Sequence, residues 1–279
     1  MTDPYTAIAH HLPNEVAIGG ALITMVEPHP GHEHAYNRWY EDDHFYSGAM
    51  HGPWVFAGRR FVAPRALRDR RADVEECAVE PPDAGCYISC YWITENHEED
   101  TERWSFLAMA DALMPHGRGF AQRTHVYTAF HRYCFGVTRA AGPMKPHLAL
   151  DAGFPGLLVE IVDAPSEAAF HDLERALHDT ILPAALGHSP ASMVLAFTPK
   201  PFTQGLIDDP STPPVAPPAG VGRRLCLLWF LDDDPTGIDD DVLRRHHAAL
   251  ASDSAGTLRF SGAFVPTLVG TDRYVDELR

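Results

Sequence analysis

The order of strand-like and helix-like segments in this chain predicts an α+β protein made of two consecutive β-α-β-β-α-β units. The order found in residues 16–137 is repeated in residues 157–269. The sequences of the first helices of the two halves align without a gap, and in this alignment His44 matches His178. Strand-like segments such as residues 85–94 (GCYISCYWIT) are apolar on both faces, so each sheet needs a cover on both sides. We therefore expect two four-stranded antiparallel sheets that pack face to face or curl into a barrel within one chain.

The elements of the first half follow from apolar runs and helix breakers. Residues 16–26 (VAIGGALITMV) form an apolar run typical of a buried strand, which Pro28 and Pro30 end. The later elements of this half are a helix over 33–45, strands over 54–62 and 85–94, a helix that begins at the acidic residues 98–102 and stops at 115–117, and a strand over 124–137.

The second half repeats these elements with the same spacing of breakers. Its expected strands cover 157–162, 191–198, 224–231 and 257–269, and its expected helices cover 166–182 and 238–251. In both halves an irregular insertion, 63–84 or 202–222, separates the second and third strands and is typical of a lid, a dimer arm or a cover for a sheet edge. We interpret the repetition as an internal duplication, with one unit over 1–140 and the other over 141–279.

Composition limits the partners of the protein. The formal charge of −16 comes from 38 acidic against 22 basic residues, which disfavours nucleic acid and anionic membranes. The five cysteines are odd in number and form no CxxC pair, so we expect buried free thiols. The chain starts without a basic leader and has no apolar run of the roughly 18 residues that a membrane helix needs. These features favour a soluble cytoplasmic protein.

The densest group of chemically active side chains lies in residues 32–51 (HEHAYNRWYEDDHFYSGAMH). In a helix, Tyr36, Tyr40 and His44 share one face, with Asn37 beside them. Histidine titrates near neutral pH, so His44 is our candidate general base or acid, and Tyr40 or Asn37 can stabilise an oxyanion. The alternative is that His44 only stabilises the negative end of the helix dipole.

Further candidates for substrate binding are aromatic or basic residues in or near this helix and in its second copy. They are Trp39, Tyr36, His51, Arg59, His178 and His171. Arg59 and Arg60 point to opposite sides of the second strand, so one of them can reach a cleft and bind a substrate carboxylate or phenolate. The alternative is a salt bridge at the rim with one of the many acidic residues. Core, interface or surface positions are the alternative for the histidines.

No metal site is expected from the histidine spacing. His32, His34 and His51 fit no zinc pattern. The pair Glu41-x-x-His44 matches half of a di-iron helix motif, but the second helix offers Arg175 in place of the partner carboxylate.

The motif Trp39-Tyr40-x-x-x-His44 after a first strand, together with the element order, resembles the dimeric α/β-barrel superfamily of ferredoxin-like domains, and within it the EthD-like branch. The resemblance covers almost the whole chain and implies two ferredoxin-like units that close an α/β-barrel, with a small-molecule cleft at the aromatic helix. The second copy departs from the motif, because Leu173 and Glu174 stand in place of Trp39 and Tyr40.

The resemblance implies a small-molecule protein of one of several kinds. The superfamily includes cofactor-free monooxygenases, lactone isomerases, polyketide cyclases, dehydratases and haem-binding enzymes, and a fold alone does not choose among them. Our leading hypothesis is a cofactor-free enzyme in which His44 moves a proton on a hydrophobic, oxygenated molecule, aromatic or polyketide-like. The reaction would be an isomerisation, cyclisation, dehydration or oxygenation.

Two other hypotheses stay open. One is a haem protein of the aldoxime dehydratase or peroxidase type, with His44, His131 or His178 as axial ligand. The other is a non-catalytic small-molecule binding or assembly protein. The chain lacks GxGxxG, GxxxxGK[ST] and GxSxG motifs, which disfavours nucleotide-cofactor dehydrogenases, P-loop enzymes and α/β-hydrolases. Formation of a homodimer through the insertions is also open.

Overall fold

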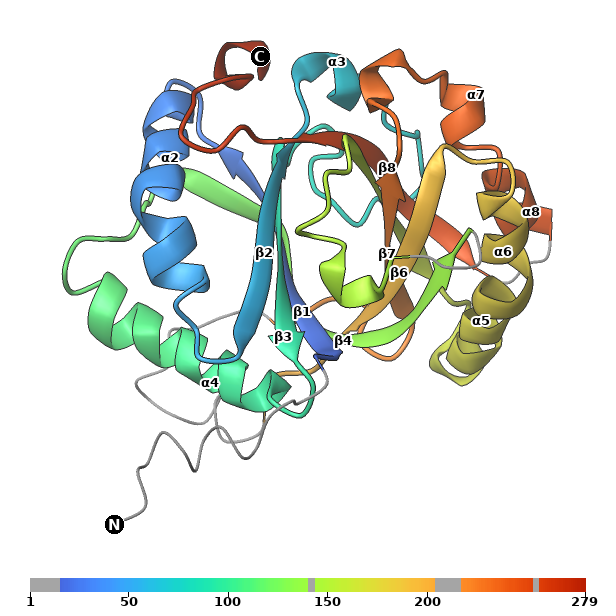
Figure 1. Ribbon diagram of the computed structural model, residues 1–279, viewed down its shortest axis with the longest axis horizontal. Helices are drawn as coiled ribbons and strands as arrows, with labels where there is room; N and C mark the ends of the chain where they lie inside the picture. The colour runs from blue at the N-terminus through green and yellow to red at the C-terminus, as the bar shows by residue number, and fades with distance from the viewer. Residues whose placement is uncertain (1–15, 140–143, 204–216, 253–255) are drawn as a thin grey trace.

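A computed structural model describes residues 16–139, 144–203, 217–252 and 256–279, and its centre is a closed barrel of antiparallel strands (Figure 1). The strands are β1 (Ile18–Pro28), β2 (Val55–Val62), β3 (Tyr87–Thr94), β4 (Arg123–Thr138), β5 (Gly156–Asp163), β6 (Ala191–Pro199), β7 (Arg224–Leu231) and β8 (Thr257–Pro266). Around the barrel they follow the order β1-β3-β2-β8-β5-β7-β6-β4.

The two halves of the chain use the same strand order. The first half runs β4-β1-β3-β2 and the second runs β8-β5-β7-β6, so each places its fourth, first, third and second strand side by side. The barrel closes where β2 pairs with β8 and β4 pairs with β6. The predicted fold class is therefore confirmed: two ferredoxin-like sheets form one α/β-barrel within a single chain.

Helices cover the outside of the barrel, and apart from the short helix of residues 65–68 those of the first half lie on one side and those of the second half on the other (Figure 1). The α-helices are α2 (Glu33–Trp39), α3 (Arg65–Arg68), α4 (Glu98–Leu107), α5 (Phe170–Ala176), α6 (Leu182–Leu186), α7 (Asp240–Leu243) and α8 (His247–Ser252). The π-helical turns are η1 (Tyr40–Ala49), η2 (Ala108–Leu113) and η5 (Leu177–Ile181), and short 3₁₀ turns are η3 (Pro146–Leu148), η4 (Glu167–Ala169), η6 (Pro235–Gly237) and η7 (Val275–Glu277). In both halves the first helix contains an α-helical part that continues as a π-helix, and in the second half the turn η4 precedes the α-helical part.

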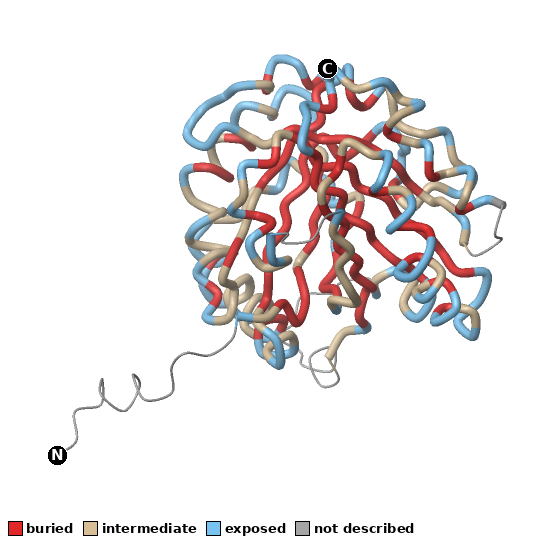
Figure 2. Tube along the Cα trace, turned by 45° about the vertical axis from the view of Figure 1, so that its right-hand side comes forward, coloured by how far each residue is buried: buried red, intermediate tan, exposed pale blue. Residues whose placement is uncertain are grey.

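Alternation along each strand separates an inner from an outer layer of side chains. On β1, Ala21, Ile23 and Met25 are fully buried inside the barrel, whereas Leu22 and Thr24 lie on the outer face below the first helix. Figure 2 shows that the buried residues lie mainly along the strands. Apolar side chains from both halves fill the barrel interior.

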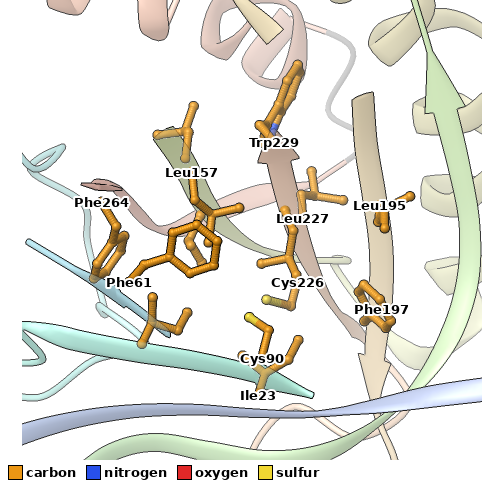
Figure 3. Packing of buried hydrophobic residues seen from close by; sticks show 14 of the residues in the cluster. Ile23, Phe61, Cys90, Leu157, Leu195, Phe197, Cys226, Leu227, Trp229 and Phe264 are labelled. Carbon is orange, nitrogen blue, oxygen red and sulfur yellow. The ribbon is translucent and has the colours of Figure 1, made fainter. Parts of the chain in front are cut away.

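The predicted free thiols are confirmed. All five cysteines are unpaired, and three of them are buried. Cys90 and Cys226 bring their sulfur atoms toward one another from opposite halves of the barrel (Figure 3). These thiols act as small apolar side chains in the core, because burial raises the pKa of Cys90 and of Cys226 and keeps both protonated.

The prediction of one continuous last helix is wrong. In place of a continuous helix over 238–251, the chain forms α7 and α8 with a turn between them. A continuous helix would point the adjacent residues His246 and His247 in different directions, but both contact the carboxylate of Glu160. The turn removes the rotation that a continuous helix imposes between neighbouring residues.

The insertions and the boundary between units are described in part. The first insertion contains α3, whose Arg68 is buried. Most of the second insertion, residues 204–216, and the predicted boundary at 140/141 lie outside the described residues. In the part of the chain that the structure covers, no helix combines the length and the apolar character needed to cross a bilayer.

The C-terminal segment fastens the two halves together, since it leaves β8 and passes over the start of α2 (Figure 1). Asn37 on α2 donates from Nδ2 to the carbonyl oxygen of Thr271 at 2.9 Å and to Asp272 Oδ1 at 2.8 Å. The guanidinium of Arg279 pairs with Glu27 and Glu33, both at 2.7 Å. The tail of the second half thus fixes the position of the first helix.

Candidate active site

A cavity of about 620 Å³ lies between the first helix and the outer face of the sheet. Strands β1, β3 and β4 form its floor, α2 and η1 form one wall, and α4 and η2 form the other. Its apolar lining includes Leu22, Val26, Phe106, Met109, Val126 and Phe130. Its polar lining includes Tyr36, Tyr40, His44, Tyr91, Arg123 and His125. A mostly apolar cavity with a few polar groups is typical of a small-molecule site.

His44 stands on η1 and lines this cavity. Its ring stacks on Trp39 with centroids 4.2 Å apart and meets Tyr40 edge to face at 5.2 Å. Burial, together with the nearby positive charge of Arg123, lowers the pKa of His44 to about 3. The imidazole is therefore neutral at physiological pH, the form that can accept a proton or ligate a metal.

Gly48 makes room for this imidazole. His44 Nδ1 is buried with no hydrogen-bond partner among the described residues, and a Cβ atom at Gly48 would lie 2.6 Å from it. The Nδ1 edge of the ring therefore lies against the helix backbone, and Nε2 is the ring nitrogen that can reach a bound molecule. Close approach of a backbone to a functional ring is a common reason for glycine.

We expect Gly48→Ala to displace the His44 ring and lower kcat/KM by roughly tenfold or more, because small displacements of a reacting group are costly. The melting temperature should change little, since the side chain of His44 can move. Gly153→Ala is the matched control, because a Cβ atom there meets nothing within 4 Å. Equal loss of activity in both variants, or in neither, would contradict a positioning role for Gly48.

Arg123 places a positive charge in the cavity. Its guanidinium lies 4.5 Å from the centre of the Trp39 ring, which also stacks on His44. Its Nε donates to His125 Nε2 at 3.0 Å, while its Nη1 is buried and has no hydrogen-bond partner in the described part of the chain. Among the described residues no carboxylate forms an ion pair with Arg123, so the cavity holds an uncompensated cation that favours an anionic ligand.

Two tyrosine hydroxyls lie at the floor of the cavity. Tyr40 from the helix and Tyr91 from β3 share a hydrogen bond of 2.5 Å between their Oη atoms. One hydroxyl hydrogen occupies this bond, so the other can be donated to a ligand. The predicted contribution of Tyr40 to a polar site thus involves a second residue, Tyr91.

Asn37, predicted to act beside His44, serves a different contact. One residue after Tyr36 on the helix, its side chain turns toward β2, and its Oδ1 accepts from Arg60 Nη1 at 2.7 Å. Arg60 Nη1 also donates to Glu41 Oε1 at 3.1 Å in a buried ion pair. The guanidinium lies within about 5.3 Å of the ring centres of Tyr36, Tyr40 and Tyr87. Asn37 therefore holds the helix to the sheet, and it does not line the cavity.

We expect Glu41→Ala to lower the free energy of unfolding by about 3 to 5 kcal/mol, because it leaves the buried Arg60 cation without its carboxylate. Asp42→Ala is the matched control on the next position, where a half-exposed pair with Arg38 spans 3.5 Å and should contribute less than about 1 kcal/mol. Urea unfolding of both variants measures the difference. Similar small losses in the two would show that the Arg60 pair does not stabilise the helix.

The other predicted site residues take varied positions. Tyr36 is buried in the cavity wall, and Trp39 packs behind His44 while its Nε1 donates to the carbonyl oxygen of Arg118 at 2.8 Å. His51 is exposed near Trp104. Arg59 points to the barrel side and donates to the carbonyl oxygens of Leu150 and Ala152. The predicted opposite orientation of Arg59 and Arg60 is confirmed, but neither residue lines the cavity.

The first helix of the second half presents its histidines at the surface. His171 and His178 have side chains that are 84% and 51% exposed and pair with Glu174 and Asp179 on their own helix. Apolar residues take the space between this helix and the sheet, namely Phe170, Leu173, Leu177, Ile181 and Leu182. The aligned histidines His44 and His178 thus stand in different surroundings.

Sequence reasoning did not single out Arg123, His125 or Tyr91. All three come from strands, and their alternation with neighbouring residues is that of any half-buried strand. His125 hydrogen-bonds through Nδ1 to Thr128 Oγ1 at 2.9 Å, and burial lowers the pKa of His125 to about 4. No local motif marks Arg123 and Tyr91 as site residues, because they meet Trp39 and Tyr40 from a helix that is distant in the sequence.

His131, one of the three predicted haem ligands, lies inside the barrel. Its Nε2 bonds to the hydroxyl of Tyr127 at 2.8 Å and its Nδ1 to the carbonyl oxygen of Ala129 at 2.9 Å. Burial lowers the pKa of His131 to about 3. Both ring nitrogens are thus occupied. Of the three candidate ligands, only His44 lines the cavity.

The buried, neutral His131 should make the protein acid-sensitive. Above pH 6.5 the histidine is neutral in both states. Between pH 6.5 and about 3 only the unfolded chain binds the proton, so the free energy of unfolding falls by up to about 1.4 kcal/mol per pH unit from this residue. In His131→Gln that slope should be smaller by one proton, measured by urea unfolding between pH 7 and 5. An unchanged slope would mean that His131 is protonated in the fold.

Comparisons with known proteins support the fold. No family model and no curated protein sequence matches the chain. A solved structure of a candidate chlorite dismutase, TA0507, has a TM-score of 0.50 and 9% identity, covering 94% of this chain and all of its own. An anthrone oxidase-like protein (TM-score 0.49, 6% identity) covers 92% of this chain and 98% of its own. A heme-binding protein from Thermus thermophilus (TM-score 0.45, 9% identity) covers 96% of each chain.

The similarity to the TA0507 structure agrees with the α/β-barrel fold of ferredoxin-like units and shows nothing finer. The identities are too low to carry a function from one protein to another, because one fold hosts many chemistries. The scores of the second and third structures are also too low to support an argument. Function must therefore be argued from the cavity itself.

Proposed function

We propose that the protein is an enzyme that removes a proton from a hydrophobic, oxygenated small molecule, aromatic or polyketide-like, bound in the cavity of the first half. The observation that carries the proposal is the pairing of a neutral imidazole, His44, with the guanidinium of Arg123 in an apolar cavity. One group can take a proton, and the other can stabilise the anion that remains.

The proposed step transfers an acidic C–H or O–H proton of the substrate to His44 Nε2. The electron pair stays on the substrate as an enolate or phenolate, whose oxygen is held by Arg123 and by the free hydroxyl hydrogen of the Tyr40–Tyr91 pair. Positive charge and burial hold the pKa of His44 low before the step. The new anion offsets both effects, because it gives the imidazolium a counter-charge.

From this anion, reprotonation at another atom gives isomerisation, attack on an internal carbonyl gives cyclisation, and loss of hydroxide gives dehydration. Oxygenation without a cofactor would need molecular oxygen as a second substrate. The test is a panel of enolisable aromatic ketones and polyhydroxylated aromatics, followed by absorbance and by an oxygen electrode. Turnover of at least one member supports the proposal.

A non-catalytic binding protein is the competing reading of the same cavity. It predicts that members of the panel bind without being consumed. In that case substitution of His44 would change the affinity for the ligand, and no turnover would be measured in the wild type or in the variant. Binding without turnover across the panel would therefore contradict the enzymatic proposal.

Haem binding is a second candidate, favoured by the unprotonated state of His44. Neutral imidazole is the form that ligates haem iron, and bound haem would supply redox chemistry. His44 would hold the haem iron, and Arg123 would hold a propionate. Reconstitution should then give a stoichiometric Soret band that His44→Ala removes and His178→Ala keeps. Absence of that band in the wild type would rule against this candidate.

We also infer that the two halves arose by duplication of one ferredoxin-like unit of the EthD-like type. The shared strand order and the change from α- to π-helix in both first helices support this inference. The loss of the tyrosine and tryptophan motif in the second helix is consistent with an active cavity in the first unit alone.

A further inference from the structure

A second cluster of chemically active side chains lies outside the cavity, on the opposite side of the barrel. Glu160 stands on the outer face of β5, and His246 and His247 lie at the break between α7 and α8. His246 Nε2 is 2.7 Å from Glu160 Oε2, and His247 Nε2 is 2.5 Å from Glu160 Oε1. All three ligand atoms lie within 4.8 Å of one another.

The convergence of the two rings depends on the break in the helix. Adjacent residues of a continuous helix point about 100° apart and could not both reach one carboxylate. Residues 244–246 form a turn instead, and the following residues start α8. The local fold thus brings both Nε2 atoms to the same carboxylate.

The two histidines are the nearest nitrogen groups to the carboxylate of Glu160 among the described residues. Its side chain is fully buried, and no lysine or arginine among the described residues pairs with it. The nearby Arg224 and Arg259 pair with Asp163 instead. The remaining contact is the Ser261 hydroxyl, which donates to Glu160 Oε1 at 3.1 Å. A buried carboxylate of this kind needs a compensating positive charge.

We propose that Glu160, His246 and His247 bind one divalent transition-metal ion of the zinc type. Two imidazoles and a carboxylate are borderline donors that suit zinc, cobalt, nickel or iron better than magnesium or calcium. The metal takes the place of the hydrogen bonds that now join the two imidazoles to the carboxylate. Three protein ligands leave a coordination position for water.

The site can be reached from solvent, because the His247 side chain is 20% exposed. Ser261 orients the carboxylate, and Trp229 packs on His246 with ring centres 4.3 Å apart. Such outer contacts fix the geometry of metal ligands. The inference is independent of the chemistry proposed for His44, which lies in the other half of the chain.

Zinc titration of the chelator-treated full chain, followed by calorimetry, tests the proposal. We expect one zinc ion per chain at the tight site and a rise in melting temperature with zinc. His247→Ala should weaken this site by at least about tenfold, since even outer contacts of metal ligands contribute that much. Glu160→Gln should have a similar effect. Cobalt should give a visible ligand-field spectrum that His247→Ala loses.

His178→Ala is the matched control, because His178 is an exposed histidine that pairs with a carboxylate. With 17 histidines in the chain, weak surface binding is expected in every variant. Equal zinc affinity in the wild type and in His247→Ala would overturn the proposal, as would a loss of equal size in His178→Ala. If Glu160→Gln does not fold, the partly exposed His247 carries the test.

Discussion

Replacing His44 by alanine is expected to lower kcat/KM by about 10² to 10⁴-fold for any member of the panel that the wild type consumes, because the general base is lost. Affinity for an unreactive aromatic anion such as 2-naphthoate should change much less, since Arg123 remains. His178→Ala is the control, because it removes the aligned histidine that is half-exposed at the surface.

The pH profile of the wild type adds a second check on His44. Because burial and Arg123 lower its pKa to about 3, the free enzyme keeps the neutral base throughout the physiological range. The plot of kcat/KM against pH should therefore show no inflection near 6.5 from this histidine. An inflection near 6.5 that disappears in His44→Ala would contradict the low pKa, and unchanged turnover in that variant would contradict its role.

Replacing Arg123 by glutamine is expected to lower kcat/KM by about 10² to 10³-fold, the usual cost of removing a group that stabilises developing negative charge. Arg123→Lys should recover part of the loss, because it restores the charge without the planar donor set. Arg123→Gln should also raise the pKa of 4-nitrophenol bound in the cavity. Absorbance reports this pKa, so the measurement does not require the natural substrate.

Arg132→Gln on the same strand is the matched control for Arg123. Arg132 is exposed and does not line the cavity, so its loss should leave both readouts unchanged. If the two variants behave alike, the positive charge of Arg123 does not act on the ligand.

The barrel could be predicted because its evidence is periodic and repeated. Every strand named from the sequence exists within a few residues of its predicted bounds. Tyr36, Tyr40 and His44 could be grouped because they lie on one helix, where spacing fixes which side chains share a face. Asn37 is next to Tyr36 on the helix, so spacing alone cannot show that its side chain turns toward Arg60 and away from the cavity.

The rest of the site depends on contacts between distant parts of the chain. Arg123 joins Trp39 and His44 from a strand some eighty residues later, and Tyr91 joins Tyr40 across 51 positions. The metal cluster joins residues 86 and 87 positions apart. Local spacing carries no signal for such encounters. The break that brings His246 and His247 together also contains no proline or glycine to mark it.

The central claim is that Arg123 makes this apolar cavity a site for an aromatic anion. The most direct measurement compares binding of 2-naphthoate with that of the neutral 2-naphthamide, in the wild type and in Arg123→Gln. We predict that the wild type binds the carboxylate at least about tenfold more tightly, a difference of about 1.4 kcal/mol, and that the variant loses this preference. Equal affinity for the two compounds in the wild type, or a preference that survives in Arg123→Gln, would contradict the account.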